Sequence, residues 1–238
     1  MSPDGSARAD RHFDQELAVV RDLLLRMASV AEEQLRAAIG AVQRRDAGAA
    51  GKTVGRDSEI DALEIEIEER AILLLARRQP MAGDLRRLVA TIKISNDLER
   101  VGDHAVNIAQ CAMRLAEELP ITVGVVPELD RMANVATRML RDSIEAFIDG
   151  DAELARDVCL RDDEVDRLND SVFRIMLTVM AEKPVAITSA LQMMLVSRNL
   201  ERVADLATNL GEDVIYIVEA RTIKHHAEEH EREGEHDQ

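Results

Sequence analysis

The sequence predicts an all-α fold built from two tandem copies of a three-helix bundle, with six long helices in total. Three observations support this prediction. First, 46% of the 238 residues are hydrophobic but only 2% are aromatic, whereas sandwiches and barrels depend on aromatic and β-branched strands. Second, the apolar residues recur at spacings of 3 and 4, the helical period. Third, the chain repeats itself.

The helices are bounded by prolines and defined by their apolar stripes. Leu17, Val20, Leu24, Met27 and Ala31 begin the first stripe, and none of the prolines needs to lie inside a helical pattern. The only alternative to helix is Ile121 to Val126, a short run between two prolines that is typical of a linker. The predicted helices span residues 11–45, 50–79, 82–118, 127–149, 151–182 and 186–222.

The internal repeat covers most of the chain. A shift of 105 residues superimposes Met27 on Met132 and Asp57 on Asp162, and a shift of 102 applies after Pro80. Seven of the twelve residues in 96–107 are identical to their equivalents in 198–209. We therefore expect a first repeat at 1–119, a linker at 120–127, a second repeat at 128–223 and a tail at 224–238.

The tail differs in composition from the repeats. It contains His225, His226, His230 and His236 among acidic residues and has no apolar face. Such a segment does not bury enough apolar surface to fold. We expect it to be disordered, with nonspecific metal scavenging as the alternative.

Charge and cysteine content exclude several classes of protein. The net charge of −16 repels nucleic acid and anionic membrane surfaces, and no apolar run is long enough to cross a bilayer. The start of the chain is polar and unlike a signal peptide. Cys111 and Cys159 are far apart and in no paired spacing, which is typical of a reducing compartment. We therefore expect a cytoplasmic protein without direct membrane insertion.

Familiar catalytic motifs are missing from the sequence. Gly51-Lys52-Thr53 resembles the end of a phosphate-binding loop, but the residue five positions before Gly51 is Asp46 and no strand precedes it. The Glu-x-x-His spacing of ferritin-like di-iron proteins occurs only in the tail, as at Glu233 and His236. We therefore expect no catalytic residues.

Paired carboxylates are the remaining candidates for chemistry. Acidic residues spaced i, i+4 lie on one helix face and repel each other unless a cation lies between them. A single such pair is usually a solvated helix face, but here two pairs recur at equivalent positions of both repeats. The eight candidate ligands are Asp57, Asp61, Glu99, Asp103, Asp162, Asp166, Glu201 and Asp205.

Each third helix of a repeat carries an oxygen-rich stripe opposite its apolar stripe, and this stripe includes Asn107 or Asn209 as a possible additional ligand. If the second and third helices are neighbours, four carboxylates converge in each repeat. Hard oxygen donors suit iron, manganese, magnesium or calcium better than structural zinc. His104 has no equivalent histidine and is treated as incidental, and pairing of Arg100 and Arg202 with the carboxylates is the purely structural alternative.

At these motifs the sequence resembles the PhoU family of phosphate-specific transport accessory proteins, over residues 10–222. The resemblance rests on the duplicated layout, on Glu99-Arg100-Val101-Gly102-Asp103 and on its equivalent from Glu201 to Asp205. It also rests on the paired aspartates at 57–61 and 162–166. The resemblance implies two bundles related by pseudo-twofold symmetry, multinuclear metal clusters and a homodimer.

The resemblance also implies a function. A PhoU-like protein is expected to be a non-enzymatic negative regulator that links the phosphate ABC transporter ATPase to a sensor histidine kinase at the inner face of the membrane. Two alternatives remain open at this point. One is a helical scaffold with solvated acidic faces and no metal, and the other is a carboxylate-bridged di-metal hydrolase or oxidase.

Overall fold

The computed structural model describes residues 3–78, 80–118 and 123–220. Over these residues the chain is helical, with no strand. The first half forms α1 (Pro3–Arg44), α2 (Ala47–Val54), α3 (Asp57–Arg78) and α4 (Ala82–Ala116). The second half forms α5 (Pro127–Asp149), α6 (Ala152–Leu160), α7 (Asp162–Glu182), a short 3₁₀ turn η1 (Pro184–Ala186) and α8 (Ile187–Glu219). The predicted all-α, duplicated architecture is confirmed.

Two of the six helices were wrongly predicted to be continuous. The helix predicted over 50–79 is broken between Val54 and Asp57, and the one over 151–182 is broken at Arg161. The physical reason is a local tightening of the backbone: the Arg56 amide bonds to the Thr53 carbonyl, and the Arg161 amide bonds to that of Val158. These i to i−3 bonds interrupt the α-helical ladder.

The two breaks occupy equivalent positions, and so do the caps that precede them. The Asp46 side chain accepts a hydrogen bond from the Ala49 amide at the start of α2. Asp151 likewise accepts from the amides of Glu153 and Leu154 at the start of α6. Because a side-chain oxygen at this position satisfies free helix amides, the duplication reproduces the local chemistry of each connection as well as the helices.

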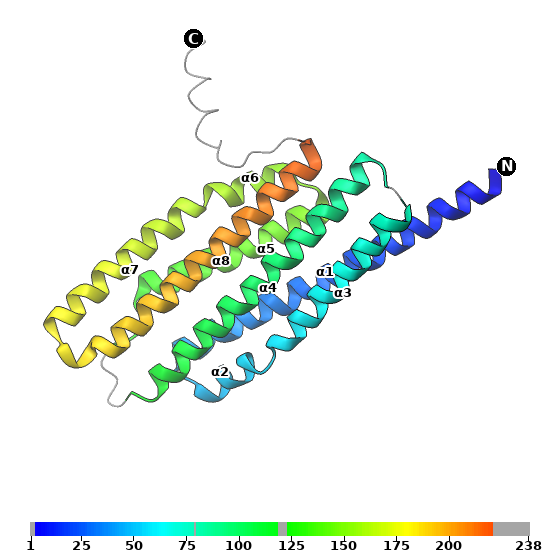
Figure 1. The fold of residues 1–238 in the computed structure, drawn as a ribbon. Coiled ribbons are helices and arrows are strands. Elements are labelled where there is room, and N and C mark those ends of the chain that lie inside the picture. The colour runs from blue at the N-terminus through cyan, green and yellow to red at the C-terminus, as the bar shows by residue number, and fades with distance from the viewer. Residues whose placement is uncertain (1–2, 79, 119–122, 221–238) are drawn as a thin grey trace, which may run out of the picture.

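The two halves pack side by side through α4 and α8, which run in opposite directions at the centre of the molecule (Figure 1). Helices α1 and α3 pack on α4, and α5 and α7 pack on α8. Contacts between α1 and α5 complete the junction of the two halves. Within each half, therefore, the helix that begins at the first acidic pair lies beside the helix that carries the second pair.

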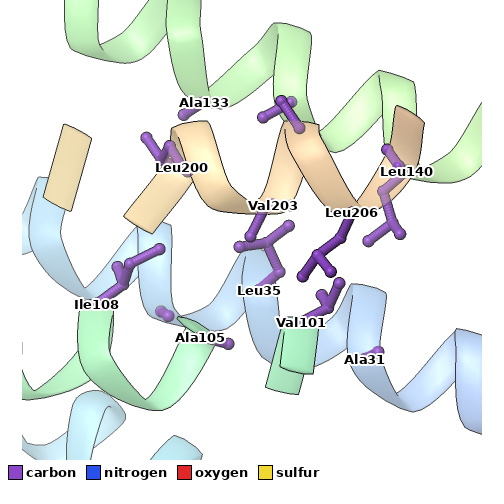
Figure 2. Packing of buried hydrophobic residues seen from close by; sticks show 14 of the residues in the cluster. Ala31, Leu35, Val101, Ala105, Ile108, Ala133, Leu140, Leu200, Val203 and Leu206 are labelled. Carbon is purple, nitrogen blue, oxygen red and sulfur yellow. The ribbon is translucent and has the colours of Figure 1, made fainter. Parts of the chain in front are cut away.

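A single aliphatic core runs through both halves. Leu35 of α1, Val101 of α4, Leu140 of α5 and Val203 of α8 belong to one buried cluster, and Figure 2 shows side chains from these helices meeting across the junction. Leucine, isoleucine, valine, methionine and alanine make up most of this cluster. Their compact shapes allow the close helix packing that the low aromatic content predicts.

The predicted limits of the repeats fall near element ends. Helix α4 ends at Ala116 and α5 begins at Pro127, the last residue of the predicted linker. The predicted tail, 224–238, lies outside the described residues. Within the described part of the chain, no helix is both long and apolar enough to span a membrane.

Candidate metal centre

The first cluster of carboxylates forms where α3 begins alongside α4. Asp57 is the first residue of α3 and Asp61 follows one turn later, while Glu99 and Asp103 lie on α4. Like-charge interactions connect Glu99 with the other three residues, so the structure brings these four side chains together.

A close helix–helix contact sets the distance between the two acidic pairs of the first cluster. Gly102 lies between Glu99 and Asp103, and a Cβ at this position would come within 2.8 Å of Ile60 Cδ1. The second repeat has Val165 and Ala204 at the equivalent positions, both buried. A larger residue on one helix thus faces a smaller one on the other in each repeat, and the combined volume is similar.

Burial and the crowding of like charges raise the pKa of Glu99 from 4.5 to about 7. Burial is the largest cause, followed by the charges of Asp103, Glu64, Asp61 and Asp57. The pKa of Asp57 is raised for the same reasons, by burial and then by Asp61 and Asp103. Ionising this cluster is therefore unfavourable without a compensating cation.

The second cluster has the same composition where α7 begins alongside α8. Burial, followed by the charges of Asp205, Asp166, Asp163 and Glu201, raises the pKa of Asp162 to about 6. The pKa of Asp166 is also raised, by burial and by neighbouring carboxylates, but Arg202 acts in the opposite direction. All eight predicted residues are thus gathered into two groups of four, and their role as metal ligands stays a prediction.

The two equivalent arginines, Arg100 on α4 and Arg202 on α8, bind different carboxylates. Arg202 donates to Asp205 at 2.7 Å, inside the second cluster. Its equivalent Arg100 turns the other way and donates to Asp97 at 3.2 Å. The structural alternative raised by the sequence, pairing of the arginine with a cluster carboxylate, therefore occurs at Arg202, whereas Arg100 binds an acid outside the cluster.

The remaining sequence candidates lie at the margins of the clusters. Asn209 lines a hollow of about 340 Å³ together with Asp162, Asp205 and both arginines, Arg100 and Arg202. Asn107 is exposed on α4. His104 Nδ1 lies 2.9 Å from Asn199 Oδ1 across the junction of the halves, which agrees with its treatment as incidental to metal binding.

Sequence reasoning missed two acidic residues that belong to these surfaces. Glu64 acts on the pKa of Glu99, and Asp163 acts on those of Asp162 and Asp166. Glu64 lies seven residues after Asp57 and hence on the same helix face. The spacing alone could have indicated that Glu64 lies beside Asp57. The comparison of the repeats did not indicate it, because the equivalent residue in the second repeat is the uncharged Asn169.

The side chains as placed do not form a closed metal site. Within the described residues, no group of three or more His, Cys, Asp or Glu side chains is arranged to hold an ion. The donor set nevertheless fits a hard cation, because each cluster offers several carboxylate oxygens whose mutual repulsion a cation would relieve. Coordination would require these side chains to rotate about their χ angles.

Comparison with known proteins identifies the duplicated unit. The family model described as the PhoU domain matches twice, at residues 24–112 and 129–214. A phosphate-specific transport system accessory protein PhoU homolog from Clostridium acetobutylicum is 36% identical over 212 residues, covering 89% of this chain and 96% of that protein. The homolog from Caulobacter vibrioides is 39% identical over 202 residues, covering 85% of this chain and 87% of that protein.

Solved structures show the same arrangement of helices. The crystal structure of PhoU from Pseudomonas aeruginosa superimposes with a TM-score of 0.83 at 37% identity, and the match covers 88% of this chain and 100% of that one. The phosphate transport system regulatory protein PhoU from Streptococcus pneumoniae gives a TM-score of 0.82 at 25% identity, covering 89% of this chain and 99% of that one.

Proposed function

Because this chain belongs to the PhoU family, we propose that it is a non-enzymatic negative regulator of phosphate uptake and of phosphate-starvation signalling. The observation that carries the proposal is the match of both halves to the PhoU domain, over residues 24–112 and 129–214. The similar proteins are named phosphate-specific transport system accessory proteins and cover nearly the whole chain.

The two carboxylate clusters would be metal sites of this regulator. The first would use Asp57, Asp61, Glu99 and Asp103, and the equivalent residues of the second repeat would form the other. Support comes from the raised pKa values of Glu99 and Asp162, which reflect burial and like charges held together. Iron, manganese and magnesium fit the oxygen donors, and an open surface cluster accommodates more than one ion.

The regulator would act through protein contacts. Its proposed partners are the ATPase subunit of the phosphate ABC transporter and a sensor histidine kinase, met at the cytoplasmic face of the membrane by a homodimer of this chain. Large apolar side chains are exposed on the flanking helices, among them Ile65 and Ile72 on α3 and Phe173 and Leu177 on α7. They support an interaction role, because exposed apolar surface often marks protein interfaces.

One observation favours the alternative of a metal-free helical scaffold. Arg202 already neutralises Asp205 at 2.7 Å, so part of the second cluster has a cation of its own. The first cluster is the sharper test of metal binding because Arg100 is paired with Asp97 instead.

The regulatory proposal is tested by deleting the gene and measuring transcripts of phosphate-starvation genes in phosphate-rich medium. We expect these genes to be switched on in the deletion strain and repressed again by the wild-type chain supplied in trans. Unchanged expression after deletion would overturn the proposal.

The contribution of the clusters is tested by complementing the same strain with variants. We expect Glu99→Gln/Asp103→Asn to restore repression incompletely. The matched control is Glu69→Gln/Glu145→Gln, which removes the same charge from two exposed residues outside both clusters and should complement fully. Full complementation by the cluster variant would separate regulation from metal binding.

A further inference from the structure

A cleft of about 800 Å³ opens between the two halves, at the end of the molecule opposite the linker. Its walls come from the N-terminal parts of α1 and α4 and the C-terminal parts of α5 and α8, which lie together in Figure 1. None of the eight cluster residues lines the cleft.

Comparison of the two ends of the molecule explains why the cleft exists. At the linker end, Arg45 extends its side chain into the junction and donates hydrogen bonds to the carbonyls of Leu115, at 2.6 Å, and Val123. The residues equivalent to these three are Gly150, Ile217 and Ala18, and all three line the cleft. The chain thus fills one end with an arginine side chain and leaves the other open because glycine replaces it.

The glycine is favoured at this position by the backbone. Both residues adopt a left-handed conformation, with φ of 50° at Arg45 and 66° at Gly150, which glycine adopts without strain. A Cβ at Gly150 would make only an ordinary contact of 3.8 Å with Val218. Space for a side chain is therefore present and unused.

The wall of the cleft carries a guanidinium group with an unsatisfied donor. Arg86 Nε is buried and has no hydrogen-bond partner among the described residues. Arg21 and Arg87, both exposed, add guanidinium groups to the lining. A buried donor without an acceptor is costly, and a guanidinium group prefers a carboxylate or phosphate as its acceptor.

Carboxylates also line the cleft, but none of the described residues accepts a hydrogen bond from Arg86 Nε. Asp84 lies 4.0 Å from Arg87, and Asp14 and Asp149 are exposed at the margin. The first turn of α4, which contributes Gly83 to the lining, has no side-chain cap at its start. The positive end of the α4 helix dipole therefore attracts an anion in addition to Arg86.

The remainder of the lining is mainly aliphatic. Leu17, Val20, Val214, Ile217 and Val218 contribute, and Phe147 is the aromatic residue among them. Aliphatic walls favour an aliphatic ligand because its burial removes apolar surface from water. A volume of about 800 Å³ lies in the range of small-molecule sites.

We propose that this cleft between the repeats binds an amphipathic anion, a carboxylate or phosphate group attached to an aliphatic chain, with the anionic group on Arg86 and the chain against the α1, α5 and α8 walls. The site is independent of the proposed metal clusters. Two sources supply this chemistry: a free acylated or alkylated anion, and an anionic lipid of the membrane.

Isothermal titration calorimetry with octyl phosphate below its micellar concentration tests the proposal. We expect saturable binding with one site per chain, and much weaker heats with inorganic phosphate or 1-octanol, each of which supplies one half of the ligand. Arg86→Gln should weaken octyl phosphate binding at least tenfold, because a charged hydrogen bond is lost. The matched control Arg174→Gln removes an exposed arginine on α7 and should leave the affinity within twofold.

A second variant tests the apolar part without changing charge. Thr91 lines the cleft, and its equivalent in the second repeat is the buried Met193, so the fold accommodates methionine there. Thr91→Met should reduce binding by filling the cleft, with an unchanged circular dichroism spectrum. Equal octyl phosphate affinities in wild type, Arg86→Gln and Thr91→Met would overturn the proposal.

Sedimentation with phosphatidylglycerol vesicles identifies the source. Sedimentation of wild type but not of Arg86→Gln would assign the ligand to the bilayer. Binding of octyl phosphate without sedimentation would assign it to a free amphiphile. Neither interaction with wild type would overturn the proposal.

Discussion

Arg100 and Arg202 occupy equivalent positions in the two repeats, but their guanidinium groups turn in opposite directions along the helix. Arg100 bonds to Asp97, three residues earlier, and Arg202 bonds to Asp205, three residues later. The residue equivalent to Asp97 is Asn199, which bears no charge. An arginine with an acid on both sides in one repeat thus has an acid on only one side in the other.

This difference contributes to making the two carboxylate clusters electrostatically unequal. The second cluster contains an arginine that lowers the pKa of Asp166 against the effect of its acidic neighbours. In the first, the causes that shift the pKa values of Glu99 and Asp57 all act upward. Duplication preserved the ligand candidates, while substitutions outside them, such as asparagine for aspartate at position 199, change how strongly each cluster should attract a cation.

The largest effect on stability is expected when Arg45, at the linker end, is replaced by the glycine found at its equivalent position, Gly150, beside the cleft. Arg45→Gly removes charged hydrogen bonds to the carbonyls of Leu115 and Val123. It also relieves the backbone strain of a non-glycine residue in the left-handed conformation. The net loss in the free energy of unfolding should be about 2 kcal/mol, measured by urea denaturation. Full stability of this variant would show that Arg45 does not secure the linker end.

The next effect concerns the contact that sets the spacing of the first cluster. Gly102→Ala places a Cβ 2.8 Å from Ile60 Cδ1, and we expect a loss of about 1 kcal/mol, since the side chain can shift. Ile60→Val/Gly102→Ala reproduces the second repeat's pair and should recover most of that loss in a double-mutant cycle. Additive costs would contradict the proposed size complementarity.

The pH dependence of stability should reveal the crowding of the first cluster. Because the pKa of Glu99 is raised to about 7 in the folded protein, its protonated form stabilises the fold at low pH. That contribution is lost as the pH rises from about 4.5 towards 7. With chelator present, the stability of Glu99→Gln relative to wild type should therefore increase between pH 5 and pH 8.

Urea denaturation across this pH range checks the expectation, with Glu69→Gln as the control for removal of an exposed charge. Manganese should reduce the advantage of Glu99→Gln, because the wild type keeps all four carboxylates of the first cluster and should be stabilised more than the variant. A constant difference between the two proteins at all pH values would contradict the raised pKa.

The smallest effect is expected from exchanging the residues that orient the two arginines. Asp97→Asn leaves Asp103 as the acid one turn away from Arg100 on the helix and should weaken manganese binding at the first cluster a few-fold. Asn199→Asp should draw Arg202 away from Asp205 and strengthen binding at the second. Calorimetric titration of manganese measures both, and identical affinities in the two variants and wild type would refute the role of these positions.

The sequence predicted the features that depend on periodicity and repetition. The apolar stripes predicted the helices, and the repeated spacing identified all eight carboxylates that the structure gathers into two clusters. It did not predict the breaks before Asp57 and Asp162, because no proline lies at either break and the helix is interrupted by a tightening of backbone hydrogen bonds. The orientation of Arg100 and the cleft beside Gly150 depend on contacts between distant segments, which no local pattern contains.

The central claim is that the paired carboxylates are metal sites, and metal content tests it most directly. Untagged wild type, Glu99→Gln/Asp103→Asn and Glu201→Gln/Asp205→Asn would be incubated with manganese, desalted and measured by mass spectrometry of the metal. The tail histidines contribute equally to all three. We predict less retained manganese in both variants, with the greater loss in the first-repeat variant. Equal manganese in all three proteins would contradict the claim.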